Sequence, residues 1–219
     1  PAPRPIGQPI RVGWVSEEAF GPVDPEITAA VKASAALLKD FGCNVEEVGL
    51  PFLKETDFAS PYFMLLYQQL IPYVTELAKG READLYATSS DIIEMSTVSL
   101  TEYMEGLAKM EQLRSLFAGY FAKYDVLLCP VTPYTAQPHQ LQEVVVNGTT
   151  VSAFHVMAAT APFNMTGLPA LSVPFGLSSE RLPISVQLIA KWFDEATILQ
   201  LGQIIESATT KTGFRHPLP

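Results

Sequence analysis

Two serine pairs are the residues of this chain that come closest to a nucleophilic site. Ser89-Ser90 lies in "ATSSDI" and Ser178-Ser179 lies in "GLSSER". A nucleophilic serine needs a neighbouring base and a close-lying backbone that forms an oxyanion hole, which favours glycines around it. Neither pair is enclosed by glycines, and the sequence contains no Gly-Gly. We interpret both pairs as polar loop residues and predict no catalytic residue in this chain.

The histidines and cysteines form no pattern typical of a catalytic or metal site. His139, His155 and His216 are scattered, and Cys43 and Cys129 lie far apart. A lone histidine is more often a satisfied core or surface residue than a base, and His155 stands in an otherwise apolar stretch. Two cysteines are too few for a disulfide framework or a cysteine-rich zinc site, so we interpret both as small buried hydrophobic residues. We predict no metal and no cofactor.

Length and charge limit the class of protein. The 219 residues are 48% hydrophobic, carry a formal charge of −9 and include only 14 Lys and Arg. Nucleic-acid binding depends on clustered cations, which are missing here. No apolar run reaches the roughly 18 residues of a membrane span, and "PAPRPIGQP" lacks the apolar core of a secretory signal. We therefore expect one soluble cytoplasmic domain over residues 1–219, with neither nucleic-acid nor membrane partners.

The first 51 residues predict a β-α-β unit that would position any site. "IRVGWV" (Ile10–Val15) is a short apolar strand, and a helix follows between an N-cap at Asp24 and a stop at Gly42. "CNVEEVGLP" (Cys43–Pro51) returns as a second strand, parallel to the first. The helix is amphipathic, with apolar residues at helical spacing: Ile27, Val31, Leu38 and Phe41.

The middle of the chain is predicted to be mainly helical. Residues 57–97 contain Phe58, Tyr62, Phe63, Tyr67, Tyr73 and Tyr86, which can line an apolar ligand pocket or belong to the core. A long helix then begins at a Ser99 or Thr101 cap, and the buried strand Val126–Cys129 follows it. Open α/β sheets bind ligands at the carboxyl ends of such strands.

The last third predicts a helix over 151–162, two strands and a final helix. "LPALSVPFG" (Leu168–Gly176) is apolar throughout, which is typical of a strand covered on both faces. "LPISVQLIA" (Leu182–Ala190) is the second strand, and the last helix begins near Asp194. An Asn-x-Thr-Gly turn at 164–167 ends the preceding helix. Together these elements predict a layered α/β fold, with a mixed β-sheet flanked by helices.

Four segments occur in a fixed order that resembles one enzyme family. They reach from Gly13 to Gly202 and read "GWVSEEAFGPVDPEITAAVKASAALLKDFGCNVEEVGLP", "YDVLLCPVTPYTA", "FNMTGLPALSVPFG" and "LPISVQLIAKWFDEATILQLG". Together they resemble the carboxyl-terminal half of the amidase signature family. The resemblance implies the carboxyl-terminal portion of the amidase signature fold and an enzyme that hydrolyses carboxylic amides.

The resemblance also implies where the chemistry would lie. The family uses a Ser–Ser–Lys triad in which a lysine activates the nucleophilic serine through a second serine. In the family, the glycine-rich serine loop and the lysine precede the segment that matches "GWVSEEAFGPVDPEI". The resemblance therefore places no catalytic residue in this chain. It predicts that the chain alone is inactive and that an amino-terminal catalytic half is its partner.

Family members wall the substrate pocket with the loop after "VLLCP" and with the segment that matches "FHVMAATAP". This makes Thr132, Met157 and Thr160 candidate substrate-binding residues, although packing explains Met157 equally well. The family's tRNA-dependent amidotransferase subunits hold glutamine with charged groups, including an acid on this segment, whereas 151–162 contains no acid. At Ser185 the family usually has glycine. A general small-molecule amide hydrolase is therefore favoured over a glutamine-using member.

Two functional classes stay open at this point. The chain is either part of a hydrolase whose catalytic half lies elsewhere, or a non-catalytic binding or assembly module derived from the family. In either case, a sheet whose neighbouring strands belong to the other half would end in an unpaired edge. We therefore expect a homodimer or larger species to form through that edge.

Overall fold

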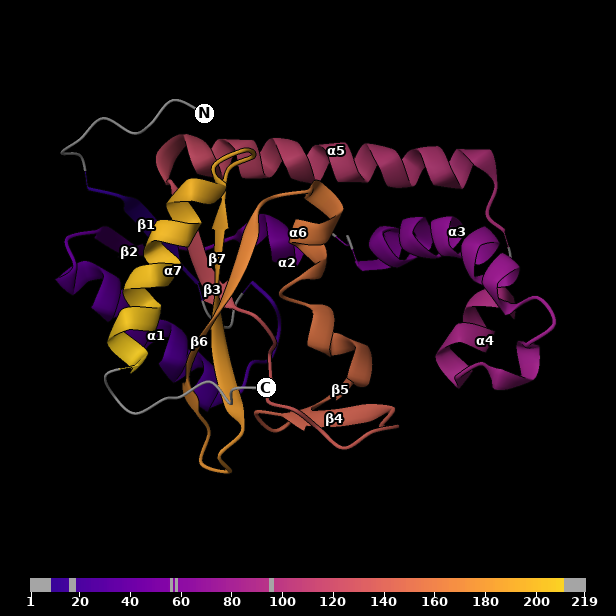
Figure 1. Ribbon diagram of the computed structural model, residues 1–219. Coiled ribbons are helices and arrows are strands. Elements are labelled where there is room, and N and C mark those ends of the chain that lie inside the picture. Colours follow the sequence, from indigo (N-terminus) through magenta and orange to yellow (C-terminus); the bar gives the residue numbers. More distant parts are fainter. Residues whose placement is uncertain (1–8, 16–18, 56, 58, 95–96, 211–219) are drawn as a thin grey trace.

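The structure is a computed structural model, and it describes residues 9–15, 19–55, 57, 59–94 and 97–210. Phe58 and His216 lie outside these residues. The centre of the fold is a mixed sheet in the order β2-β1-β3-β7-β6 (Figure 1). β1 pairs in parallel with β2 and β3, whereas β7 runs antiparallel to β3 and β6. The strands are β1 (Arg11–Trp14), β2 (Asn44–Glu47), β3 (Val126–Pro130), β6 (Ala170–Leu177) and β7 (Pro183–Ala190).

Helices cover both faces of this sheet, and the burial of β3 shows this. All five residues of β3 are buried. Val126 and Leu128 pack in the cluster that α1 (Pro25–Asp40) and α7 (Glu195–Thr210) complete on one face. Leu127 and Cys129 point the other way, into the cluster beneath α5 (Leu100–Lys123). Because successive side chains of a strand point to opposite faces, β3 must be apolar throughout. The predicted layered α/β fold is confirmed.

Helix α1 begins and ends where the sequence predicts. Asp24 is the N-cap, and its carboxylate accepts a hydrogen bond from the Glu26 N–H. Gly42 follows the helix with a φ of +86°, a conformation that glycine adopts without steric cost. Phe41 is the exception, because it caps the helix and is 57% exposed instead of lying on the buried face. The parallel pairing of β1 with β2 completes the predicted unit.

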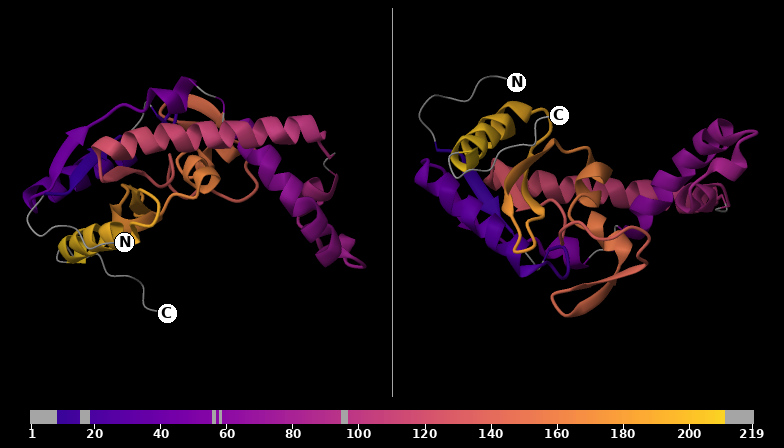
Figure 2. Two further views of the ribbon diagram at one scale, coloured as in Figure 1. Left: turned by 90° about the horizontal axis from the view of Figure 1, so that it is seen from above. Right: turned by 60° about the horizontal axis from the view of Figure 1, so that its bottom comes forward.

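Helices α3 and α4 form an arm that projects from the body (Figure 2). The predicted helical region is divided into α3 (Ala59–Ala78), a short 3₁₀ turn (Glu82–Asp84) and α4 (Ala87–Glu94). Ser99 caps α5 through a capping box with Glu102. A Cβ on Gly106 would collide with Met64 and Leu65, so glycine allows α3 and α5 to pack closely there.

The predicted helix over 151–162 is wrong. This stretch contains the end of strand β5 (Thr149–Ser152), a 3₁₀ turn (Ala153–Met157) and the start of α6 (Ala161–Thr166). β5 pairs with β4 (Glu143–Val146) in a hairpin whose turn residues, Asn147 and Gly148, both have positive φ. Pro162 begins a helix instead of ending one, because a proline in the first turn loses no helical hydrogen bond. α6 ends at Gly167, as the turn prediction requires.

Strand β6 lies at the edge of the sheet, which corrects the expectation that both of its faces are covered. Val173 is its one fully buried residue, and Ala170, Ser172 and Leu177 are exposed. Proline cannot donate a ladder hydrogen bond, so Pro174 suits an edge strand, and the register shifts between Pro174 and Gly176. A short helix that the sequence did not predict, α2 (Pro51–Glu55), follows the opposite edge of the sheet.

Burial of two ionisable groups predicts alkaline unfolding. Burial raises the pKa of the Cys129 thiol from 9.0 to about 12, and it also raises the pKa of Tyr120. Between pH 9 and 12 the unfolded thiol has lost a proton that the folded thiol keeps. The free energy of unfolding therefore falls as the pH rises, by at most about 4 kcal/mol for Cys129. Urea unfolding at a series of pH values measures this decline. In Cys129→Ala it is expected to be shallower, and an unchanged slope would contradict the assignment.

Candidate functional site

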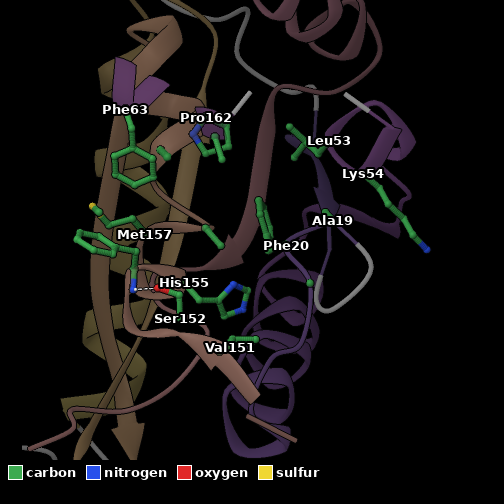
Figure 3. Close-up of a pocket in the computed structure, with 15 residues that line it drawn as sticks. Ala19, Phe20, Leu53, Lys54, Phe63, Val151, Ser152, His155, Met157 and Pro162 are labelled. Atoms are coloured by element: carbon green, nitrogen blue, oxygen red, sulfur yellow. Dashed lines mark hydrogen bonds between the residues drawn. The ribbon is translucent and has the colours of Figure 1, made fainter. Parts of the chain in front are cut away.

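A pocket of about 760 Å³ lies beside the carboxyl end of β1 (Figure 3). The loop after β1 contributes Ala19–Gly21, and α2 contributes Leu53 and Lys54. Helix α3 and the segment from β5 to α6 form the rest of the wall. Four stretches that are distant in the sequence therefore surround one concave site of the size that small-molecule ligands occupy.

Aromatic rings form the base and the rim of this pocket. Phe20 contacts Phe163 edge to face at 6.4 Å, and Phe163 packs on the buried Phe117 of α5. At the rim, Phe63 of α3 meets Phe154 at 5.8 Å, again edge to face. The base is therefore continuous with the rigid core, whereas the rim joins the projecting arm to the main body.

His155 lines the pocket but is held by the backbone. Its Nε2 atom lies 2.9 Å from the Pro22 carbonyl oxygen and donates to it, and its ring stacks on Tyr134. The Tyr134 hydroxyl donates to the Ala153 carbonyl at 2.7 Å. Burial raises the pKa of Tyr134, which keeps this hydroxyl protonated as a donor. The prediction that His155 is a satisfied residue is confirmed, although it occupies a 3₁₀ turn at the pocket wall.

The three candidate substrate-binding residues occupy different places. Met157 lines the pocket beside Phe63 (Figure 3). The Thr132 hydroxyl donates to the Tyr134 carbonyl at 2.9 Å. The Thr160 hydroxyl donates to the Met157 carbonyl at 3.3 Å and precedes α6. Of the three, only Met157 is among the described residues that line the pocket, and each threonine hydroxyl donates to a backbone carbonyl instead.

A buried amide fixes the inner wall of the pocket to the sheet. Gln187 of β7 is 4% exposed, and its Nε2 atom donates to the carbonyl oxygens of Ala159 at 3.0 Å and Pro130 at 3.3 Å. A buried amide without these acceptors would cost free energy, so the contacts hold the segment after Met157 against β3 and β7. Gln187 has an apolar sequence neighbourhood, and only the tertiary contacts identify its role.

One serine pair holds a turn and the other lies within a helix. The Ser178 hydroxyl accepts a hydrogen bond from the Leu182 N–H, and the Ser179 hydroxyl contacts Glu26, so this pair holds the turn between β6 and β7 as predicted. Ser89 and Ser90 lie within helix α4, which corrects their assignment to a loop. Among the described residues, no cluster of three or more His, Cys, Asp or Glu side chains forms a metal site. Within the same residues, no helix is long and apolar enough to span a membrane.

Residues the sequence did not single out contribute much of the pocket. Phe20 lies in the loop that follows the first strand, and an aromatic residue in the loop at the carboxyl end of a strand in an open sheet is a signal that could have identified it. Phe154 and Ser152 carry no comparable signal, since both were assigned to a continuous helix or its flank. Phe63 belongs to the aromatic-rich region for which a pocket role was one of two alternatives.

Comparison with known proteins agrees with this geometry. Residues 5–199 match the Amidase family. The chain is 32% identical to the A subunit of the glutamyl-tRNA(Gln) amidotransferase of Brevibacillus brevis, over 90% of this chain and 44% of that protein. It is 28% identical to the corresponding protein of Desulforamulus reducens, over 94% of this chain and 46% of that protein. The chain therefore spans about half the length of the curated relatives it matches.

A solved structure supports the fold assignment independently. The chain superimposes on 6-aminohexanoate cyclic dimer hydrolase with a TM-score of 0.79 and 25% identity, over 95% of this chain and 47% of the hydrolase. The family match covers most of the sequence, and the five-stranded mixed sheet with its flanking helices superimposes on the matched 47% of this enzyme. The chain therefore belongs to the amidase signature family.

Proposed function

We propose that this chain forms the substrate-pocket and scaffold half of an enzyme that hydrolyses carboxylic amides. The observation that carries the proposal is the concave apolar pocket at the carboxyl end of β1, on a fold of the amidase signature family. The hydrogen bonds of Ser178 and Ser179 lead to the backbone and to Glu26, which supports a catalytic segment outside this chain. We propose residues 1–219 as a single domain that binds the amide against Met157, with Thr132 and Thr160 shaping the wall.

A second candidate is a part of the A subunit of a tRNA-dependent amidotransferase, and the names of the similar sequences favour it. This candidate implies a complex with other proteins and glutamine as the amide. The segment 151–162 offers no carboxylate for the ammonium group of glutamine, which supports the hydrolase of simple amides instead. A third candidate, a non-catalytic binding module, is the outcome if no amide is hydrolysed.

Labelling with a fluorophosphonate tests where the nucleophile lies. The chain alone is expected to give no labelled serine and no amide turnover, because among the described residues no lysine or histidine is hydrogen-bonded to any of the four paired serines. The probe is added to the purified chain, and intact-mass spectrometry measures the labelled fraction. A serine hydrolase of known activity serves as the control. Stoichiometric labelling of Ser89, Ser90, Ser178 or Ser179 would overturn the proposal.

The exposed edge of β6 predicts self-association of the chain. Its outer backbone groups face no other strand among the described residues, and such a row can pair with a second copy. We expect a homodimer whose dissociation constant lies in the micromolar range, measured by sedimentation equilibrium. Ser172→Pro is expected to weaken the dimer, because proline removes a backbone donor from this edge strand. A single monomeric species at high concentration would contradict the prediction.

A further inference from the structure

The rim of the pocket is built from aromatic side chains of two separate segments. Phe63 stacks on Tyr67 within α3 at 5.8 Å and meets Phe154 of the 3₁₀ turn edge to face. Phe154 is 52% exposed, so its ring is available to a ligand. Met157 lies beside Phe63 (Figure 3), and a thioether makes favourable contacts with aromatic groups. The rim therefore presents flat, polarisable surfaces to a ligand in the pocket.

Contacts between α3 and the body hold Phe63 in place. The Asn164 side-chain amide donates to the Tyr62 hydroxyl at 3.4 Å, which links α3 to α6. On the other side of α3, Leu65 is buried against α5 close to Gly106. Phe63 therefore lies between Tyr62, which contacts α6, and Leu65, which packs against α5. A ring held in this way can contribute to binding with little loss of side-chain entropy.

The polar groups of the lining favour an uncharged ligand. Its described residues include no carboxylate, and the Nε2 atom of His155 is already engaged with the Pro22 carbonyl. Lys54 is exposed, and Figure 3 shows its side chain directed away from the aromatic residues. Against these described residues, the ammonium group of a zwitterion such as glutamine would have no counter-charge in an apolar site, which is costly.

We propose that this pocket selects uncharged amides that carry an aromatic or similarly bulky apolar substituent, and that Phe63 and Phe154 determine this selectivity. The inference rests on the proposed amide hydrolysis and names the substrate class for it. The substituent lies in the pocket against the two rings and Met157, and the base formed by Phe20 limits its depth.

Binding of three probes to the chain tests the proposal. Acetanilide, acetamide and glutamine are titrated separately, and saturation-transfer NMR and calorimetry measure the affinity of each. Acetanilide is expected to bind at least tenfold more tightly than either other probe. Phe63→Ala and Phe154→Ala are each expected to weaken acetanilide binding about fivefold to tenfold, because each removes one ring contact. Phe63→Leu is expected to recover part of the loss.

Phe193→Ala is the matched control. Phe193 is 76% exposed on the turn after β7 and does not line the pocket, so the variant is expected to bind acetanilide as the unchanged chain does. Circular dichroism checks that all variants are folded. The inference would be overturned if the chain bound glutamine as tightly as acetanilide or did not bind acetanilide at all. It would also be overturned if Phe193→Ala lost as much acetanilide affinity as Phe63→Ala.

Kinetics of a pair, this chain associated with a polypeptide that carries the family's Ser–Ser–Lys segment, separate this inference from the proposed function. Hydrolysis of glutamine but not of acetanilide would reject the aromatic selectivity and leave amide hydrolysis intact. Hydrolysis of neither, by a pair that is soluble and associated, would reject the proposed function itself. Hydrolysis of acetanilide with a KM that rises in Phe63→Ala while kcat is retained would support both.

Discussion

Co-expression of this chain with a polypeptide that carries the family's Ser–Ser–Lys segment is expected to produce an active amide hydrolase. Neither part is expected to turn over substrate alone, because under the proposed function one supplies the nucleophile and the other the pocket. Positioning of two reacting groups can lower a barrier by about 7 to 11 kcal/mol, so even an incompletely closed site should give measurable turnover. Release of ammonia or aniline from simple amides measures it.

The control for complementation is a pair whose catalytic polypeptide has alanine in place of the nucleophilic serine. This pair is expected to associate normally and to release no product. Weaker or absent activity on glutamine is expected of the intact pair. If a soluble, stably associated pair hydrolyses no amide at all, the enzyme proposal fails and the binding-module alternative replaces it.

Val173→Asp is expected to unfold or severely destabilise the chain. Val173 is 5% exposed and packs in the cluster formed by β3, β7, α1 and α7. A carboxylate there would be buried without a counter-charge, at a cost of about 3 to 5 kcal/mol, which is a large part of the stability of an ordinary domain. Urea unfolding followed by circular dichroism measures the loss, and complementation by this variant is expected to disappear with it.

Ser172→Asp is the matched control for this substitution. Ser172 is the preceding residue of β6, and its side chain is exposed. The same carboxylate is therefore expected to stay hydrated and to change the free energy of unfolding by less than about 0.5 kcal/mol. If both variants lose stability equally, β6 does not present alternate residues to core and solvent as the structure describes.

Local signals in the sequence were enough to predict most of the fold. Asp24 and Ser99 start helices because their side chains satisfy backbone N–H groups of the first turn, and this depends on only a few neighbouring residues. The apolar run of β3 indicated a strand buried on both faces, which is confirmed. The ordered family segments then identified the fold class, because they cover nearly the whole chain.

Some short sequence patterns are compatible with two different local structures, and these patterns gave wrong predictions. β6 is as apolar as a central strand, and only the sheet order shows that it lies at an edge. Pro162 is compatible with the end of a helix and with its first turn. Strand β5 and the 3₁₀ turn that follows it occupy residues 149–157, so the helix begins only at Ala161. The sequence does contain a signal for the β4–β5 hairpin, Asn147-Gly148, because both residues accept the positive φ of a tight hairpin turn.

The candidate site depended on tertiary structure far more than the fold did. By itself, the sequence determined the family, the layered architecture and Met157 as a candidate pocket residue. Only the tertiary structure brought Phe20, Phe63 and Phe154 around one cavity, because they come from a loop, a helix and a 3₁₀ turn that have no sequence relation to one another. Packing of α3 on α5 and the hydrogen bonds of Gln187 fix these segments in space, and contacts between distant residues leave no periodic trace in a sequence.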